Sequence, residues 1–203
     1  MSGAGTVVDG RNLRAERTRT ALAAAYLDLL SEADLRPTAE RIAERAGCSP
    51  RSVFKHFPDR ESLFAAASEI QEQRVLELMG DAIDPEAPLA DRIDAFVDQR
   101  ARFHEFVTPV RRAALLTEPF SAVVAEKLTM ARTAGARQVE HVFRPELDGL
   151  HRRARADVLA ALCAIAAWPT WESLRKHQGL DAERARSVLK AMLGAQLKDA
   201  AER

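Results

Sequence analysis

The sequence predicts an all-α protein of about nine helices, for three reasons. Apolar residues recur at spacings of three and four along most of the chain, which is the period of an amphipathic helix. Runs that alternate apolar and polar residues are nearly absent, and no Asn-Gly pair offers a hairpin turn. Prolines fall where helices would begin, a position that tolerates their missing N–H group. We therefore expect a small N-terminal helical domain followed by a larger helical domain.

The composition bounds the class of protein. The chain has 203 residues, of which 47% are hydrophobic and 30% are charged, as in globular proteins. Its 30 Lys and Arg balance 30 Asp and Glu, but the local distribution of charge decides whether a protein binds nucleic acid. Cys48 and Cys163 follow no metal-ligand spacing, so we expect reduced thiols and no metal. With neither a signal peptide nor an apolar run of about 20 residues, a soluble cytoplasmic protein without membrane contact is expected.

The first helices follow a tail that we expect to be disordered, residues 1–10. Residues 13–32 have the apolar spacing of a first helix. Thr38 is a suitable N-cap for a second, short helix, because its hydroxyl can accept a bond from the first turn. Gly47 supplies the left-handed residue that commonly ends a helix. The sequence thus predicts two helices joined by a short loop.

The third helix is the shortest element with a clear start and end. Ser49 can cap it and Pro50 occupies its first position, the preferred place for proline. Val53 and Phe57 are four residues apart, so they share one face of the helix, which we expect to be buried. Pro58 stops the helix. The sequence thus predicts a short helix with one buried face.

The remaining helices divide between two expected domains. Asp59 caps a fourth helix that runs to about Asp81, and the segment "DPEAP" at residues 84–88 is a plausible hinge. We therefore expect a helix-turn-helix domain at residues 11–83 and a ligand-binding and dimerisation domain at residues 84–203. The helices expected in the second domain are 88–106, 109–117, 119–146, 152–178 and 181–200.

Two short helices joined by a turn that contains glycine form a helix-turn-helix, whose second helix can enter the DNA major groove. Its outward residues would be Pro50, Arg51, Phe54 and Lys55. Arg pairs bidentately with guanine, and Lys meets a phosphate as a point charge. Thr38 and Ser49 stand at helix starts, where backbone N–H groups favour a phosphate. The alternative is a compact helical corner with no ligand, which gives no reason for an aromatic side chain in water.

The same residues carry a family resemblance. The stretch "PTAERIAERAGCSPRSVFKHFPDRESLF", Pro37 to Phe64, resembles the N-terminal signature of TetR-type transcriptional regulators. It has a Thr-capped helix with Ile-Ala, a Gly and Ser turn, a short helix ending in aromatic-x-His-Phe, and a polar opening of the next helix. The rest of the chain is similar to the family only in the number and length of its helices. The resemblance implies a DNA-binding domain in the first third of the chain.

The resemblance also implies roles for individual residues. Arg51 stands where the family often has a small residue, so we expect it to read DNA sequence. Phe54 stands where members often carry a Tyr whose hydroxyl touches a phosphate, so that contact is lost or replaced by packing against sugar. The implied contacts are Thr38 at a phosphate, Ser49, Pro50, Arg51, Ser52, Phe54 and Lys55 at or near the groove, and His56 and Arg60 at the backbone.

An arginine-rich segment precedes or opens the first helix. Two interpretations stay open. The segment can be an arm that reaches a phosphate or the minor groove, or a solvated helix start behind a disordered tail. The arginines concerned are Arg11, Arg14, Arg17 and Arg19.

Polar residues interrupt apolar helix faces in the second domain. Because an unpaired buried polar group costs ~1–3 kcal/mol, such residues need partners. One interpretation is a ligand cavity with a few orienting polar groups and apolar walls. The other is pairing within the helical bundle, or side chains that snorkel to the surface. The candidate ligand-binding residues are Phe96, Arg100, Phe103, His104, Met130, Gln138, Trp168 and Trp171.

The last two expected helices predict a homodimer. Residues 156–168 are apolar on nearly every side, which suggests a second surface covered by another subunit. The final helix repeats the pattern against a charged face, at Val188, Leu189, Met192, Leu193 and Leu197. Together they look like half of an intermolecular four-helix bundle, and the family resemblance implies the same dimer. A two-fold dimer would bind a pseudo-palindromic operator in double-stranded DNA.

These features predict a sequence-specific DNA-binding transcriptional regulator, a repressor released from its operator by a small-molecule effector. Two alternatives stay open. A dimeric helical interaction scaffold without DNA binding is supported by the missing Tyr hydroxyl at Phe54. A helical enzyme would need a site built from distant residues, since the five histidines form no HExxH and no nucleophile motif is present. No catalytic residue and no cofactor is predicted.

Overall fold

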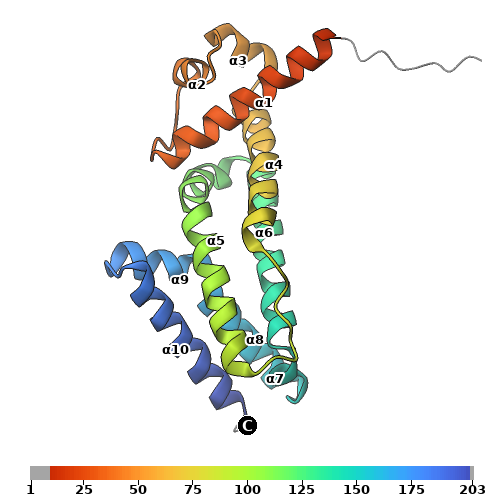
Figure 1. Ribbon diagram of the computed structural model, residues 1–203, viewed down its shortest axis with the longest axis vertical. Coiled ribbons are helices and arrows are strands. Elements are labelled where there is room, and N and C mark those ends of the chain that lie inside the picture. Colours follow the sequence, from red (N-terminus) through yellow and green to blue (C-terminus); the bar gives the residue numbers. More distant parts are fainter. Residues whose placement is uncertain (1–9, 202–203) are drawn as a thin grey trace, which may run out of the picture. The chain divides into compact units, whose positions relative to one another are not determined.

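The computed structural model describes residues 10–201, and within this range the regular structure is entirely helical (Figure 1). The predicted all-α fold is confirmed. Of the expected disordered tail, residues 1–9 lie outside the described range, and Gly10 opens the first helix. The helices are α1 Gly10–Ser31, α2 Ala39–Arg45, α3 Pro50–His56, α4 Arg60–Met79, α5 Leu89–Thr117, α6 Ala122–Val142, α7 Arg144–Asp148, α8 Arg152–Ala166, α9 Trp168–Glu172 and α10 Ala182–Ala201.

The chain forms two compact units. The first contains the residues up to 74 together with 109–125, and the second contains 75–108 together with the residues from 126 onward. This division differs from the domain limit expected near residue 84. The reason is that long helices serve both units, so no linker of turn residues marks where one unit ends.

The first unit is built on three interlocking helices. Within it α1 packs on α2 and α2 packs on α3 (Figure 1). The turn between α2 and α3 depends on Gly47, whose φ of +66° is strained for residues with a side chain. The shared core is apolar and includes Leu22, Leu27, Ile42, Val53, Phe57 and Leu63.

One predicted break in the chain is wrong. The expected helices 88–106 and 109–117 form a single helix, α5, with Pro109 inside it. Proline withholds one N–H bond from the preceding turn and disfavours a continuous helix, but tertiary packing can override that local preference. Here Val107 and Ala113 are both buried. Thr108 adds a bond from its hydroxyl to the carbonyl of His104, at 2.6 Å, in the turn before the proline.

Two predicted helices are interrupted instead. The expected helix 119–146 becomes a 3-10 turn, Glu118–Phe120, followed by α6 and the short α7. The expected helix 152–178 breaks at Ala167, whose ψ of 152° is extended. Pro169 explains the break, because it has no N–H for the carbonyl four residues earlier and its ring would clash there. After α9 the chain continues as a π-helical turn, Ser173–His177.

The second unit packs its helices around a large apolar core. Within it α10 lies along α8, and α7 touches both. Phe96 and Phe143 meet edge to face with ring centroids 5.3 Å apart, a favourable aromatic geometry. Other buried members include Val158, Leu162, Trp171, Leu189 and Leu193. Over the described residues, no helix has the length and apolar character needed to cross a membrane.

A buried ion pair fixes the start of α5 in this unit. The Arg92 side chain is only 5% exposed, and its Nη2 lies 2.5 Å from Glu146 Oε1. The same guanidinium donates to the carbonyls of Val142 and Ala87, at 2.7 and 2.8 Å. A buried cation is stable when it is both paired and hydrogen-bonded, as here. The contacts join α5 to the corner between α6 and α7.

Candidate nucleic-acid interface

Helix α3 is anchored on one face and exposed on the other. Val53 and Phe57 are 5% and 2% exposed and belong to the core of the first unit, as predicted. Arg51, Phe54 and Lys55 are exposed, with Phe54 at 65%. Pro50, at the start of the helix, is exposed as well. The sequence pattern therefore placed the two faces of this helix correctly.

The helix caps behave differently from one another. Thr38 is the N-cap of α2, with its Oγ1 accepting from the backbone N–H of Arg41 at 3.4 Å. Ser49 occupies the N-cap position of α3, but its side chain makes no capping bond. Its Oγ instead lies 3.0 Å from the Oγ of Ser52, so the two hydroxyls bind each other at the start of the helix. The expected Ser49 cap is corrected accordingly.

The basic side chains of α2 have acidic partners within the chain, and those of α3 do not among the described residues. On α2, Arg41 pairs with Asp34 at 2.6 Å and Arg45 pairs with Glu32 at 2.7 Å. On α3, Arg51 makes no ion pair with any residue in the described range. Lys55 likewise has no acidic partner there, and the first turn of α3 contains no acidic residue. The positive charge of α3 is therefore available to an external anion, whereas that of α2 is largely satisfied internally.

The junction between α3 and α4 brings further predicted contacts to the same region. His56, half-buried, ends α3, and Arg60, exposed, begins α4. Asp59 caps α4 as predicted, accepting from the backbone N–H of Ser62 at 2.7 Å. This bond holds the pKa of the Asp59 carboxyl below its usual range. Burial raises the pKa of Tyr26, and the positive charge of Arg60 nearby partly offsets that rise.

The arginine-rich opening of α1 is divided between core and solvent. The guanidinium of Arg19 lies over the ring of Phe57, 5.2 Å from its centroid, in a cation–π contact that we did not predict. Arg14 and Arg17 are exposed. The side chain of Arg11 lies outside the described part of the chain. Arg19 thus packs against the buried face of α3. For the other arginines, a DNA-binding arm and a solvated helix start both stay open.

In the second unit, most of the predicted ligand residues gather around α5. Phe96, Arg100 and His104 follow one another at four-residue spacing and are 1%, 6% and 2% exposed. Arg100 lies over the rings of Phe96 and Phe103 and donates from Nη2 to the carbonyl of Gly135 at 2.9 Å. A Cβ on Gly135 would lie 3.0 Å from that nitrogen, so the glycine makes room for the guanidinium.

The two tryptophans of α9 are bound to the same helix. Trp168 Nε1 donates to Thr108 Oγ1, and Trp171 Nε1 donates to Glu105 Oε1, both at 2.9 Å. His104 Nε2 donates to the carbonyl of Ala166 at 3.0 Å, just before the chain breaks at the end of α8. The break is thus held by side chains from two successive turns of α5.

The remaining ligand predictions have two different outcomes. Gln138 donates from Nε2 to Oε1 of Gln99. The Nε2 of Gln99 in turn donates to the carbonyl of Met79 at 2.5 Å. Met130 is 59% exposed and does not join the buried group. Gln99, 6% exposed, was missed from the sequence, although it follows Phe96 by three residues and so shares its helical face. The polar residues of this region thus have partners inside the bundle.

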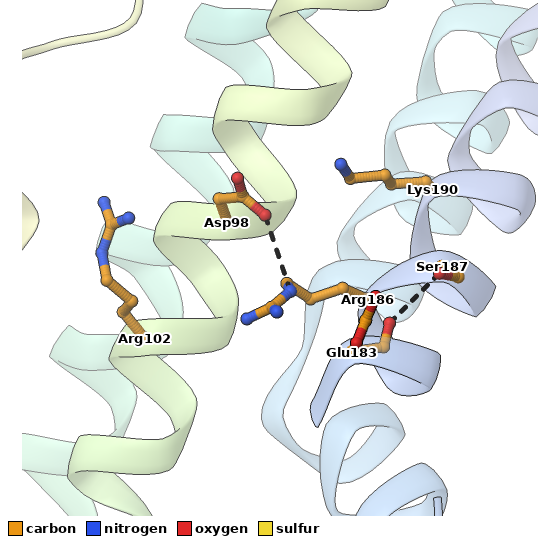
Figure 2. Close-up of a pocket in the computed structure, with 6 residues that line it drawn as sticks. All are labelled: Asp98, Arg102, Glu183, Arg186, Ser187 and Lys190. Atoms are coloured by element: carbon orange, nitrogen blue, oxygen red, sulfur yellow. Dashed lines mark hydrogen bonds and ion pairs between the residues drawn. The ribbon is translucent and has the colours of Figure 1, made fainter. Parts of the chain in front are cut away.

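A separate open groove of about 440 Å³ lies between α5 and α10 (Figure 2). Arg186 reaches across it toward Asp98, with the two groups 3.7 Å apart. Beside it Lys190 pairs with Asp94 at 2.9 Å. Small-molecule sites are mostly apolar and enclosed, whereas this groove is charged and open, so we regard it as a solvated set of ion pairs between two helices.

Among the described residues no group of three or more His, Cys, Asp or Glu side chains could hold a metal ion. Burial raises the pKa of the Cys163 thiol, which disfavours the reactive thiolate form.

Comparison with known proteins agrees with this geometry. Residues 22–67, which contain α2, α3 and the start of α4, match the family described as bacterial regulatory proteins, tetR family. No curated protein matches the chain.

Two solved structures share the fold. A transcriptional regulator from Rhodococcus sp. Rha1 is 21% identical, with a TM-score of 0.64 over 89% of this chain and 96% of that one. A Rhodococcus sp. protein described as a TetR-family transcriptional regulator is 16% identical, with a TM-score of 0.65 over 90% of this chain and 99% of that one. At these identities the likeness concerns the fold. The helix-turn-helix at residues 22–67 is that of the TetR family of bacterial transcriptional regulators, and the chain shares the fold of these two proteins.

Proposed function

We propose that this chain is a homodimeric repressor that leaves a pseudo-palindromic operator when a small molecule binds to its second unit. The observation that carries the DNA-binding part is the exposed face of α3, which presents Arg51 and Lys55 without internal ion pairs among the described residues. In a helix-turn-helix this face enters the major groove, where Arg recognises guanine and Lys meets phosphate. Thr38, Ser52, His56 and Arg60 would add contacts to the sugar-phosphate backbone around it. Such a regulator would work in the cytoplasm, where bacterial DNA lies.

The dimer is supported by the outer faces of α8 and α10. Helix α8 buries Val158 and Leu162 in its own subunit, while Ala156, Ala160 and Ala164 are exposed on its other side. On α10, Met192 is 38% exposed, and Ala191 and Ala195 near it in the sequence are exposed as well. Small side chains allow helices to approach closely, so these faces suit a four-helix bundle with a second copy. A dimer of this kind would present two copies of α3 to successive half-sites.

The effector part is supported by the buried polar residues of α5. Gln99, Arg100 and His104 lie inside an otherwise apolar unit, and each bonds to a backbone carbonyl from another segment. A ligand that supplies replacement bonds could exchange for these internal ones at little cost. Aromatic walls from Phe96, Phe103 and the tryptophans of α9 would bury its apolar part. The switch requires only that the ligand bind one dimer shape more tightly than the other.

A mobility-shift assay with DNA from upstream of the coding sequence tests the proposal. The wild type should retard this DNA, with an affinity that falls steeply as salt rises. Arg51→Ala should weaken binding by ~1–3 kcal/mol and relax selectivity at one position of each half-site. Arg102→Ala, which removes an exposed arginine from α5, is the matched control and should leave retardation unchanged. Compounds that raise the thermal stability of the protein should reduce retardation.

The alternative of a helical scaffold without DNA binding makes the opposite prediction. It would give a dimer by light scattering, no retardation even at low salt, and no difference between wild type and Arg51→Ala. Equal retardation by wild type and Arg51→Ala would contradict the role of Arg51 while leaving DNA binding intact. If Arg102→Ala still binds DNA and Arg51→Ala does not, the weaker binding comes from the lost Arg51 contact. A general loss of positive charge would weaken both variants.

A further inference from the structure

We infer that Phe54 reads sequence by packing its ring against the 5-methyl group of a thymine in the major groove. The inference rests on DNA binding through α3, as proposed above, and adds a specific base to it. A single exposed apolar side chain is common on protein surfaces, so exposure alone carries no argument. What matters is which face Phe54 occupies and which chemistry that face meets.

Phe54 lies on the cationic face of α3. Residues three and four apart are neighbours on a helix, so Phe54 and Lys55 both flank Arg51. Of the three, Phe54 is the one without charge or hydrogen-bonding atoms in its side chain, and it is 65% exposed. Phe57, three residues further on, is 2% exposed and belongs to the core of the first unit, whereas Phe54 is not part of that core.

The major groove offers one strongly apolar feature, the methyl group of thymine. A phenyl ring cannot accept or donate the hydrogen bonds that the other base edges offer, and it gains nothing from a phosphate. Packing on a thymine methyl removes apolar surface of both partners from water. Without a hydroxyl, Phe54 has no polar contact that would hold it to the sugar-phosphate backbone. The chemistry of this face therefore selects a thymine.

The spacing of the helix limits where that thymine lies. Arg51 and Phe54 are separated by roughly 4.5 Å along the helix axis, from three residues at a rise of about 1.5 Å each. Base pairs are stacked about 3.4 Å apart along each strand. The thymine should therefore lie about one or two base pairs from the guanine contacted by Arg51, once in each half-site.

Replacement of single thymines by uracil in the bound DNA tests this, because uracil pairs identically and lacks only the methyl group. The operator is first selected from random duplexes by the wild-type protein. With wild type, one uracil per half-site should weaken binding by about fourfold, the effect of one methyl group. With Phe54→Ala the same replacement should have no effect, because the ring that touches the methyl is gone. Phe54→Tyr keeps the ring and should keep the sensitivity.

Phe120→Ala is the matched control. Phe120 is 85% exposed in the 3-10 turn before α6, outside the helix-turn-helix, so its loss should leave the response to uracil unchanged. Thermal unfolding of each variant confirms that it is folded. Wild-type binding that is insensitive to uracil at every thymine would overturn the inference, and so would equal sensitivity in Phe54→Ala. A loss of affinity in Phe54→Ala that is the same for every duplex would indicate packing against sugar instead, and also overturns it. Failure of the wild type to select any duplex would instead contradict DNA binding itself.

Discussion

Single residues decide how α3 is held and what it presents. Val53 and Phe57 anchor the helix in the core, and Arg19 covers the ring of Phe57 from α1. Because these anchors fix the rotation of the helix, Arg51 and Phe54 necessarily face solvent. The sequence predicted this division correctly, since a four-residue spacing of apolar side chains is a local property. It did not predict the Arg19 contact, which joins residues far apart in the chain.

The capping residues show the same distinction. Thr38 and Asp59 bind the first turns of their helices as expected. Ser49 does not, because the hydroxyl of Ser52 competes for it. Residue type and position identify an N-cap, but the rotamer that the side chain adopts depends on its neighbours.

Asp59 provides a pH-dependent prediction at this scale. Its pKa is lowered in the folded chain by the bond from the Ser62 backbone, so its contribution to stability is complete above the unfolded pKa of about 3.9 and is lost as the pH falls through the lower folded value. Asp59→Ala should therefore be less stable than wild type near neutral pH, with the difference narrowing below about pH 3.9.

Urea unfolding at a series of pH values measures this difference. Asp59→Asn keeps a capping oxygen without a titrating group, so its stability should vary less steeply with pH than that of wild type over the same range. Asp81→Ala, at an exposed position between α4 and α5, serves as the control. A difference between wild type and Asp59→Ala that stays constant down to pH 2 would contradict the assignment.

At the scale of helices, two prolines have opposite effects: one lies inside a continuous helix and the other accompanies a break. Pro109 was expected to start a helix and instead lies inside α5, whereas Pro169 was overlooked and accompanies the break between α8 and α9. Local sequence gives a proline the same cost in both settings. What differs is the packing: Val107 and Ala113 are buried on either side of Pro109, while His104, Glu105 and Thr108 bind the chain around the break at Ala167.

Arg92 joins α5 to the corner between α6 and α7 through buried contacts. Arg92→Ala should lower the free energy of unfolding by about 3–5 kcal/mol, because it leaves Glu146 and two backbone carbonyls without their buried partner. Arg155→Ala is the matched control, since its pair with Glu140 is one-third to one-half exposed and should contribute less than about 1 kcal/mol. Urea denaturation measures both, and similar losses for the two variants would show that burial does not distinguish them.

At the scale of the whole molecule, the proposed dimer depends on the outer face of α8. The sequence suggested a helix that is buried all round, but within one chain α8 exposes three alanines, Ala156, Ala160 and Ala164. A second copy that covers those alanines and the exposed Met192 of α10 would remove their apolar surface from water. The effector region is less determined by the sequence, because the internal partners of Arg100, His104 and Gln138 come from three different segments of the second unit.

Ala160→Arg should disrupt the dimer, because a long charged side chain cannot fit between closely packed helices. Light scattering should give twice the chain mass of 22.4 kDa for wild type and the single mass for the variant. Operator binding should weaken at least tenfold with the loss of the second half-site. Ala134→Arg, at an exposed position of α6, should leave both properties unchanged. A dimeric Ala160→Arg protein would show that the interface lies elsewhere.

The sequence by itself determined the helical fold, the helix-turn-helix and the outward face of α3, because each depends on spacing, caps and turn residues within about 30 positions of one another. The tertiary structure alone decided which prolines break helices, which arginines are neutralised, and which carbonyls receive the buried polar groups of α5. Those outcomes depend on what packs against a residue from a distant part of the chain. Periodicity within a single segment contains no information about that partner.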